Sequence, residues 1–236
     1  MTTEIKFKDK IYQLDIRDAV DTSVLAEIFK HREYRAVEDV IATASDAIID
    51  VGAHAGFFSL YARALNPTVK IFALEPEPKN FTTLGQHIKN NHLIGIKPLA
   101  VALAGVSGDR ELLPAPDSHN HRLVLLSPDN IKNKTTLPVQ ALSFTDFCAQ
   151  NKIKQVALIK MDIEGGEYEV IDFMTDADFA RVACIIMEYH DWADFSHEAI
   201  DRKLRINGFG VQIFPSKFDK KMGFLLARNK RSVVSQ

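Results

Sequence analysis

Residues 47–56 read AIIDVGAHAG, an apolar run that leads into a glycine-containing turn. The run has the pattern of a strand buried on both faces, and residues 57–65 then place apolar side chains at helical spacing. Gly52 and Gly56 allow the backbone between such a strand and helix to come close to a ligand. This is the edge at which an open parallel sheet binds its ligands. The stretch therefore predicts an α/β domain with a ligand site at the turn.

The same rhythm of apolar strand, turn and helix recurs along the chain. Pro78 stands where the first turn of a helix accepts a proline, and Asn207-Gly208 ends another helix. Repeated strand–helix alternation favours parallel strands joined by crossover helices. The expected fold class is therefore α/β, with a mostly parallel, doubly wound sheet and an antiparallel C-terminal strand. Further strands are expected at residues 69–74, 94–102, 156–161 and 184–187, a closing hairpin at 211–214 and 224–227, and helices at 78–88, from 163 to about 174, and at 196–206.

The chain divides into three parts by pattern. Residues 1–44 are expected to form a hairpin and a helix that cap one side of the domain, with Ser23 as the candidate N-cap. Residues 45–230 form the α/β domain itself, and residues 231–236 a frayed tail. Prolines and polar residues interrupt the rhythm between residues 105 and 133, so loop and irregular β structure are expected there.

Asp50 holds the place of the first glycine in the common dinucleotide fingerprint, and Gly56 falls one residue late for that pattern. A carboxylate at this place would repel a pyrophosphate. It suits the zwitterionic amino-acid end of S-adenosylmethionine instead. The alternative interpretation of the motif is a glycine turn in an α/β domain that binds no ligand.

Glu75 ends the second predicted strand and follows Asp50 by 25 residues. An acidic residue at this place can accept hydrogen bonds from both ribose hydroxyls of an adenosyl ligand. Nicotinamide enzymes share the feature, so Glu75 indicates an adenosyl group without naming the cofactor. A solvated glutamate that leads a helix is the alternative interpretation.

Residues 160–169 read KMDIEGGEYE and crowd four acids and a lysine around the end of a buried strand. Helix capping accounts for one or two of the acids, because carboxylates are favoured at a helix N-terminus. Packed carboxylates also shift one another's pKa values, which is typical of working sites. The cluster has the chemistry to orient a sugar, to act as a general base or to hold a divalent cation.

These motifs, together with Glu188-Tyr189-His190, resemble the FkbM-family methyltransferases in type and order, from about Ser45 to Arg228. The element from Lys160 to Glu167 is the most specific part. The resemblance implies a Rossmann-like class I methyltransferase fold and O-methylation of a hydroxyl, commonly on a sugar or secondary metabolite. S-adenosylmethionine would be the donor and S-adenosylhomocysteine the product. His54 departs from the family, which often has asparagine there, but histidine can also donate a hydrogen bond.

His190 follows the fifth predicted strand and should share a sheet edge with Asp162. It is the candidate proton acceptor, and Asp162 and Glu164 complete the predicted catalytic set. A structural histidine is the alternative, and so is a metal-assisted mechanism in which the carboxylates hold the ion. The predicted cofactor contacts are Asp50, Gly52, His54, Gly56, Glu75 and Asp162.

Two other function classes compete with a methyltransferase. A nicotinamide-dependent oxidoreductase would need the G-x-G-x-x-G turn and a hydride-transfer apparatus, neither of which is visible. A non-catalytic adenosyl-binding scaffold would have no use for the acidic cluster and His190. Methylation of exocyclic amines usually requires an Asn/Asp-Pro-Pro-aromatic element where this chain has Asp162-Ile163-Glu164-Gly165.

Composition narrows the partners. The net charge of −2 argues against a surface for polyanions, so nucleic acid is not an expected partner. No secretion signal or apolar run long enough to span a bilayer is visible, and Cys148 and Cys184 are expected to be buried thiols. We therefore expect a cytoplasmic protein that acts on a small-molecule or saccharide acceptor. A homo-oligomer stays open at this point.

Overall fold

The computed structural model describes residues 1–114, 121–123, 135–192, 195–217 and 219–231. Most of the expected tail at 231–236 lies outside the described residues, and so does part of the expected loop at 105–133. Within the described ranges, no helix combines the length and the apolar character needed to cross a membrane.

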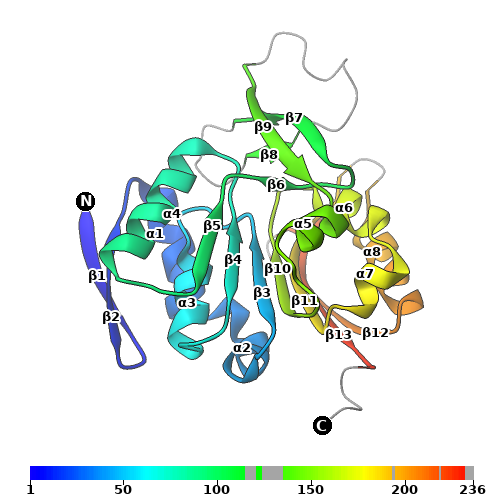
Figure 1. Cartoon of the computed structure of the whole chain (residues 1–236), viewed down its shortest axis with the longest axis horizontal. Helices are drawn as coiled ribbons and strands as arrows, with labels where there is room; N and C mark the ends of the chain where they lie inside the picture. The colour runs from blue at the N-terminus through cyan, green and yellow to red at the C-terminus, as the bar shows by residue number, and fades with distance from the viewer. Residues whose placement is uncertain (115–120, 124–134, 193–194, 218, 232–236) are drawn as a thin grey trace.

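A seven-stranded sheet forms the centre of the molecule (Figure 1), in the order β12-β13-β11-β10-β3-β4-β5. The five strands from β11 to β5 are parallel to one another, whereas β13 is antiparallel to both of its neighbours. The expected mostly parallel sheet with an antiparallel C-terminal strand is thus confirmed. The strands are β3 (Ala47–Val51), β4 (Ile71–Leu74), β5 (Ile96–Leu99), β10 (Val156–Met161), β11 (Cys184–His190), β12 (Phe209–Pro215) and β13 (Met222–Asn229).

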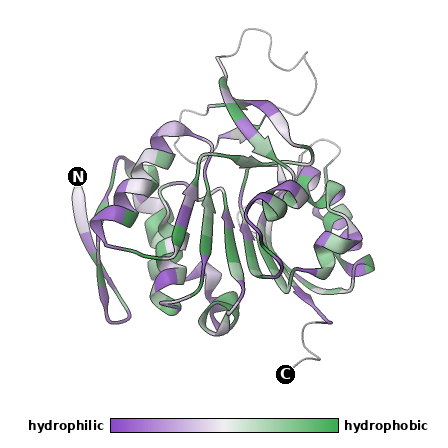
Figure 2. Ribbon diagram, in the orientation of Figure 1, coloured by the Kyte–Doolittle hydropathy of each residue, from purple (hydrophilic) through white to green (hydrophobic). Residues whose placement is uncertain are grey.

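Helices cover both faces of this sheet, each over its own apolar core. Strand β4 shows why: Ile71 and Ala73 point into one core, while Phe72 and Leu74 point into the other. Most of the central strands are green in Figure 2, as expected of a sheet buried on both faces. One face packs against α3 (Phe57–Leu65) and α4 (Pro78–Asn90), and the other against α5 (Phe144–Gln150), α6 (Glu167–Phe173), α7 (Asp176–Ala180) and α8 (His197–Ile206).

The N-terminal segment, residues 1–44, packs on the same face as α3 and α4. The expected hairpin is present as β1 (Thr2–Phe7) and β2 (Lys10–Asp15). The helix begins earlier than expected, because Asp18 rather than Ser23 caps α1 (Ala19–Leu25) by accepting from a backbone N–H of the first turn. After α1 follow a π-helical turn (Ala26–His31), a 3-10 turn (Glu33–Val37) and α2 (Glu38–Thr43).

A second, four-stranded sheet lies beyond the carboxyl ends of the central strands, at the top of Figure 1. Its order is β6-β9-β7-β8, and two of these strands, β7 and β8, lie within the region 105–133 where loop and irregular β structure were expected. Strand β9 was not expected, and it contains Pro138, a residue that argues against a strand inside an apolar run. Its strands are β6 (Ala102–Leu103), β7 (Gly108–Leu113), β8 (Arg122–Leu123) and β9 (Leu137–Leu142).

The two glycines of the first motif are needed by the protein's own packing. Both have left-handed backbone, with φ of 73° at Gly52 and 86° at Gly56. A Cβ added to Gly52 would lie 2.0 Å from the backbone oxygen of Asp162. One added to Gly56 would lie 2.4 Å from Cδ1 of Leu84 in α4. The turn after β3 is therefore pressed against the turn after β10 on one side and against α4 on the other.

We expect Gly52→Ala to lower the free energy of unfolding by at least about 2 kcal/mol, because left-handed backbone and the contact with Asp162 both penalise a Cβ. Urea denaturation followed by circular dichroism measures it. The control is Gly85→Ala, a helix-interior site with nothing within 4 Å of the added carbon. It should gain up to about 1 kcal/mol from helix propensity. A Gly52→Ala protein as stable as wild type would contradict the close approach of the two turns.

Candidate active site

A cavity of about 830 Å³ opens at the carboxyl ends of β3, β4, β10 and β11. The N-terminal segment and the small sheet also contribute to its wall, as does the turn between β12 and β13. Two histidines, His119 and His121, lie in the region that was expected to be loop and irregular β structure. His121 lines the cavity, while His119 lies outside the described residues. This is the edge at which an open parallel sheet is expected to bind ligands.

Glu75 lies at the end of β4 and is 5% exposed, in the cavity wall. Backbone N–H groups hold both oxygens of its carboxylate: Glu77 donates to Oε1 at 2.9 Å and His54 donates to Oε2 at 2.8 Å. Burial raises the pKa of Glu75 to about 7, because desolvation penalises the charged form more than these two bonds favour it. The carboxylate is thus held in one orientation, with lone pairs left over for a ligand.

The predicted cofactor residues of the glycine turn separate into two groups. Gly52 and His54 line the cavity, whereas Asp50 and Gly56 are not among its described lining residues. Asp50 is fully buried; Ser59 donates a hydrogen bond of 2.7 Å to its carboxylate. Asp50 and Gly56 thus lie behind the residues that line the cavity, and their direct contact with a cofactor stays a prediction.

Lys160 connects this turn to the acidic motif. Its ammonium donates to the carbonyl of Gly52 at 2.8 Å, and it lies 3.5 Å from Oδ1 of Asp50 and 4.0 Å from Oδ2 of Asp162. Lys160 was part of the predicted acidic motif but had no predicted role. A lysine inside a buried strand is itself a signal, because such a charge requires partners at the strand end.

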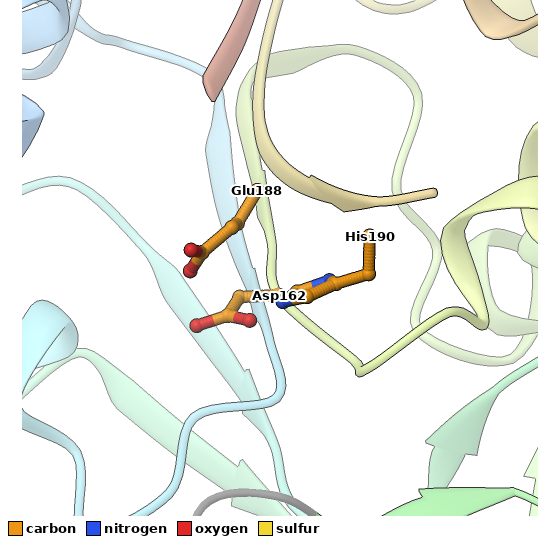
Figure 3. Close-up of side chains that lie close together, drawn as sticks. All are labelled: Asp162, Glu188 and His190. Atoms are coloured by element: carbon orange, nitrogen blue, oxygen red, sulfur yellow. The ribbon is translucent and has the colours of Figure 1, made fainter. Parts of the chain in front are cut away.

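Asp162, Glu188 and His190 come together in the cavity (Figure 3), as the strand order of β10 and β11 requires. One ligand atom from each lies within 4.8 Å of the others, in a geometry that could hold a metal ion. Glu188 and His190 are two residues apart in β11, so both side chains project from the same face of the sheet. Glu188 was not among the predicted catalytic residues.

Four carboxylates surround His190. Its Nε2 lies 3.7 Å from Glu164 and its Nδ1 lies 3.8 Å from Glu167. Burial alone lowers the pKa of His190, but the charges of Glu167, Glu164 and Asp162 outweigh burial and raise the pKa to about 10. Burial, followed by repulsion from Asp162, raises the pKa of Glu188 to about 8. At neutral pH the imidazole is therefore protonated.

The acids of the KMDIEGGEYE motif have two kinds of environment. Glu167 is fully buried and accepts the N–H groups of Ile163 and Gly165, each at 2.8 Å, and Glu169 accepts the N–H of Gly105 at 3.2 Å. Asp162 and Glu164 line the cavity instead. Glu167 thus holds the turn that precedes α6 and caps no N–H of the helix itself, whereas Asp162 and Glu164 face the cavity.

Comparison with known proteins gives consistent matches. The model of the methyltransferase FkbM domain matches residues 50–211. The hexuronic acid methyltransferase AglP of Haloferax volcanii is 27% identical over 71% of this chain and 68% of its own length. The 31-O-demethyl-FK506 methyltransferase FkbM of Streptomyces tacrolimicus is 27% identical over 78% of this chain and 80% of its own.

A solved structure with the same fold is the N-terminal domain of human METTL16 in complex with SAH. It has a TM-score of 0.53 and 16% identity, and the match covers 92% of this chain and 75% of that one. The chain thus has the class I methyltransferase fold expected from its motifs. Because the family model spans well over half of its length, the chain belongs to the FkbM family of methyltransferases.

Proposed function

We propose that the protein transfers the methyl group of S-adenosylmethionine to a hydroxyl of a sugar or another small metabolite. The observation that carries the proposal is a single cavity with Glu75 in one part of its wall and Asp162, Glu164 and His190 in another. The first part suits an adenosyl group and the second a hydroxylated acceptor. Two relatives, one named for hexuronic acid and one for 31-O-demethyl-FK506, support this acceptor class.

In the proposed complex, the ribose hydroxyls donate to the carboxylate of Glu75. The methionine end lies along the turn at Gly52 and His54, toward Asp162. Asp50 acts from behind this turn, because its charge helps to hold the ammonium of Lys160 against the carbonyl of Gly52. Gly56 allows the turn to pack on α4.

The acceptor hydroxyl lies over Asp162, Glu164 and His190. Its oxygen forms a bond to the methyl carbon as the carbon–sulfur bond breaks, which leaves a methyl ether and S-adenosylhomocysteine. The hydroxyl proton must leave in this step. His190 accepts it if the imidazole has first lost its own proton, and much of the rate comes from the placement of the two reactants.

A second route for the proton is favoured by the grouping of Asp162, Glu188 and His190. Two carboxylate oxygens and one imidazole nitrogen suit a divalent cation such as Mn²⁺ or Zn²⁺. The cation would balance the carboxylates that now keep His190 protonated. It would also favour the ionised form of the acceptor hydroxyl.

We expect the affinity for S-adenosylhomocysteine to depend on the ionisation of Glu75. Its raised pKa of about 7 means that the carboxylate is charged above pH 7 and protonated below it. Only the charged form offers both oxygens as acceptors, so affinity should fall about tenfold from pH 8 to pH 6. Calorimetric titration measures this.

Glu75→Gln is the matched variant, because it keeps the shape of the side chain and cannot ionise. It should bind S-adenosylhomocysteine about 1–3 kcal/mol more weakly at pH 8 and show no such pH dependence between 6 and 8. Wild-type protein that binds NADH tightly and ignores S-adenosylhomocysteine would overturn the proposed cofactor.

We expect His190→Ala to lower turnover by about 10²–10⁴-fold, because either route for the proton depends on this side chain. Affinity for S-adenosylhomocysteine should barely change. A radiolabelled methyl-transfer assay on hydroxylated acceptors measures turnover. A chelator that stops the wild type, with recovery on added Mn²⁺, supports the cation route. Indifference to the chelator, with turnover that rises as the pH approaches 10, supports His190 as the base. Normal turnover by His190→Ala would exclude both routes.

Glu164 and Glu169 provide a matched pair within one motif. Glu164→Gln should reduce turnover, because it removes a charge beside His190 in the cavity. Glu169→Gln should leave turnover within about twofold, since an amide oxygen can still accept the N–H of Gly105. Equal losses in the two variants, in the same methyl-transfer assay, would show that the motif acts through the fold alone.

A further inference from the structure

Arg17 and Asp21 of the N-terminal segment form an ion pair in which the carboxylate is buried and the arginine side chain is 25% exposed, beside the proposed adenosyl part of the cavity. Asp21 is fully buried and accepts from Nε of Arg17 at 2.8 Å, from Nη2 at 2.7 Å and from its backbone N–H at 2.8 Å. Nε and Nη2 of the guanidinium thus form a fork with the two carboxylate oxygens of Asp21, which fixes the direction of the guanidinium.

The guanidinium also contacts the glycine turn. Its Nη2 lies 2.9 Å from Nε2 of His54. The same nitrogen lies 3.4 Å from Oδ1 of Asp21, so the imidazole of His54 faces both members of the ion pair. The backbone of His54 has a left-handed φ of 51°, which is unfavourable for a non-glycine residue, and its N–H holds Oε2 of Glu75.

A second path joins Arg17 to the other oxygen of Glu75. Nη1 of Arg17 donates to Oδ1 of Asn80 at 2.6 Å, and the backbone N–H of Asn80 donates to Glu77 at 2.7 Å. The N–H of Glu77 in turn holds Oε1 of Glu75 at 2.9 Å. Arg17 therefore braces the residues whose N–H groups orient the two carboxylate oxygens.

We propose that Arg17 and Asp21 are positioning residues for cofactor binding, and that the N-terminal segment is in this way a working part of the adenosyl site. The inference rests on the proposed function, because it takes Glu75 as the acceptor of the ribose hydroxyls. Both residues precede the stretch at 50–211 that matches the family model. The guanidinium contacts the side chain of His54 directly and acts on Glu77 through Asn80, and the backbone N–H groups of His54 and Glu77 set the direction of the Glu75 carboxylate before a ligand arrives.

The test is calorimetric titration of S-adenosylhomocysteine into the full chain at pH 8. Arg17→Met keeps the apolar stem and removes the fork, and it should weaken binding about tenfold. The control is Arg228→Met, which breaks an exposed pair between Arg228 and Asp39 at 3.0 Å. That pair also ties the N-terminal segment to the sheet. No described hydrogen bond joins it to Glu75, so the affinity for S-adenosylhomocysteine should not change.

A double-mutant cycle separates positioning from a general loss of structure. In the Glu75→Ala background, Arg17→Met should cause little further loss, because its effect passes through the carboxylate that is already gone. A full additional tenfold loss in that background would overturn the proposal. So would an Arg17→Met protein that binds as tightly as wild type.

The two proposals fail in different ways. Wild-type protein that does not bind S-adenosylhomocysteine refutes the cofactor assignment and this inference with it. Wild-type binding that Arg17→Met leaves intact refutes only the inference. If Arg17→Met is unfolded at the assay temperature, Arg17→Lys replaces it. A single ammonium keeps the charge but cannot reach Asp21, His54 and Asn80 together, so a loss of affinity is expected for this variant too.

Discussion

The contact between two backbone turns is the constraint on which the site depends. Gly52 lies against the carbonyl of Asp162, closely enough that no Cβ fits between them, and Lys160 donates to the carbonyl of Gly52. The turn after β3 belongs to the proposed cofactor part of the cavity, and the turn after β10 belongs to the acidic cluster. In the proposed reaction their contact places a methyl donor beside an acceptor, because two reacting groups must meet within about 3–3.5 Å for transfer.

Charge balance at this contact explains the unusual protonation states. Asp50 and Asp162 flank the ammonium of Lys160, so the positive charge of the lysine is balanced before any ligand binds. The next layer has an excess of carboxylates around a single imidazole, which raises the pKa of His190. Burial, together with the neighbouring carboxylates, raises the pKa of Glu188. A cation, or the loss of the positive charge on the sulfonium after transfer, would change this balance directly.

The fold was largely predictable from the sequence. Which of the site residues line the cavity and which are buried behind them was not predictable. Alternation of strand and helix is a local pattern, so the parallel sheet and its closing hairpin could be predicted. The same pattern shows that Asp50 and Gly56 lie near a strand end, but not that one is buried behind Lys160 and the other against Leu84. Glu188 stood in a recognised motif beside His190, but its grouping with Asp162 on the neighbouring strand β10 is a tertiary contact that no local pattern fixes. The small sheet was not expected, because its strand β9 contains a proline.

Arg17 shows most clearly what sequence reasoning cannot supply. It stands 37 residues before His54 and belongs to no motif, so only the folded chain brings the two together. The contact also gives a structural use to the histidine in the glycine turn, where the resemblance to the FkbM family leads one to expect asparagine. An asparagine amide ends closer to the backbone than the Nε2 of an imidazole. The longer side chain of His54 reaches the guanidinium, while the backbone N–H of the same residue holds Glu75.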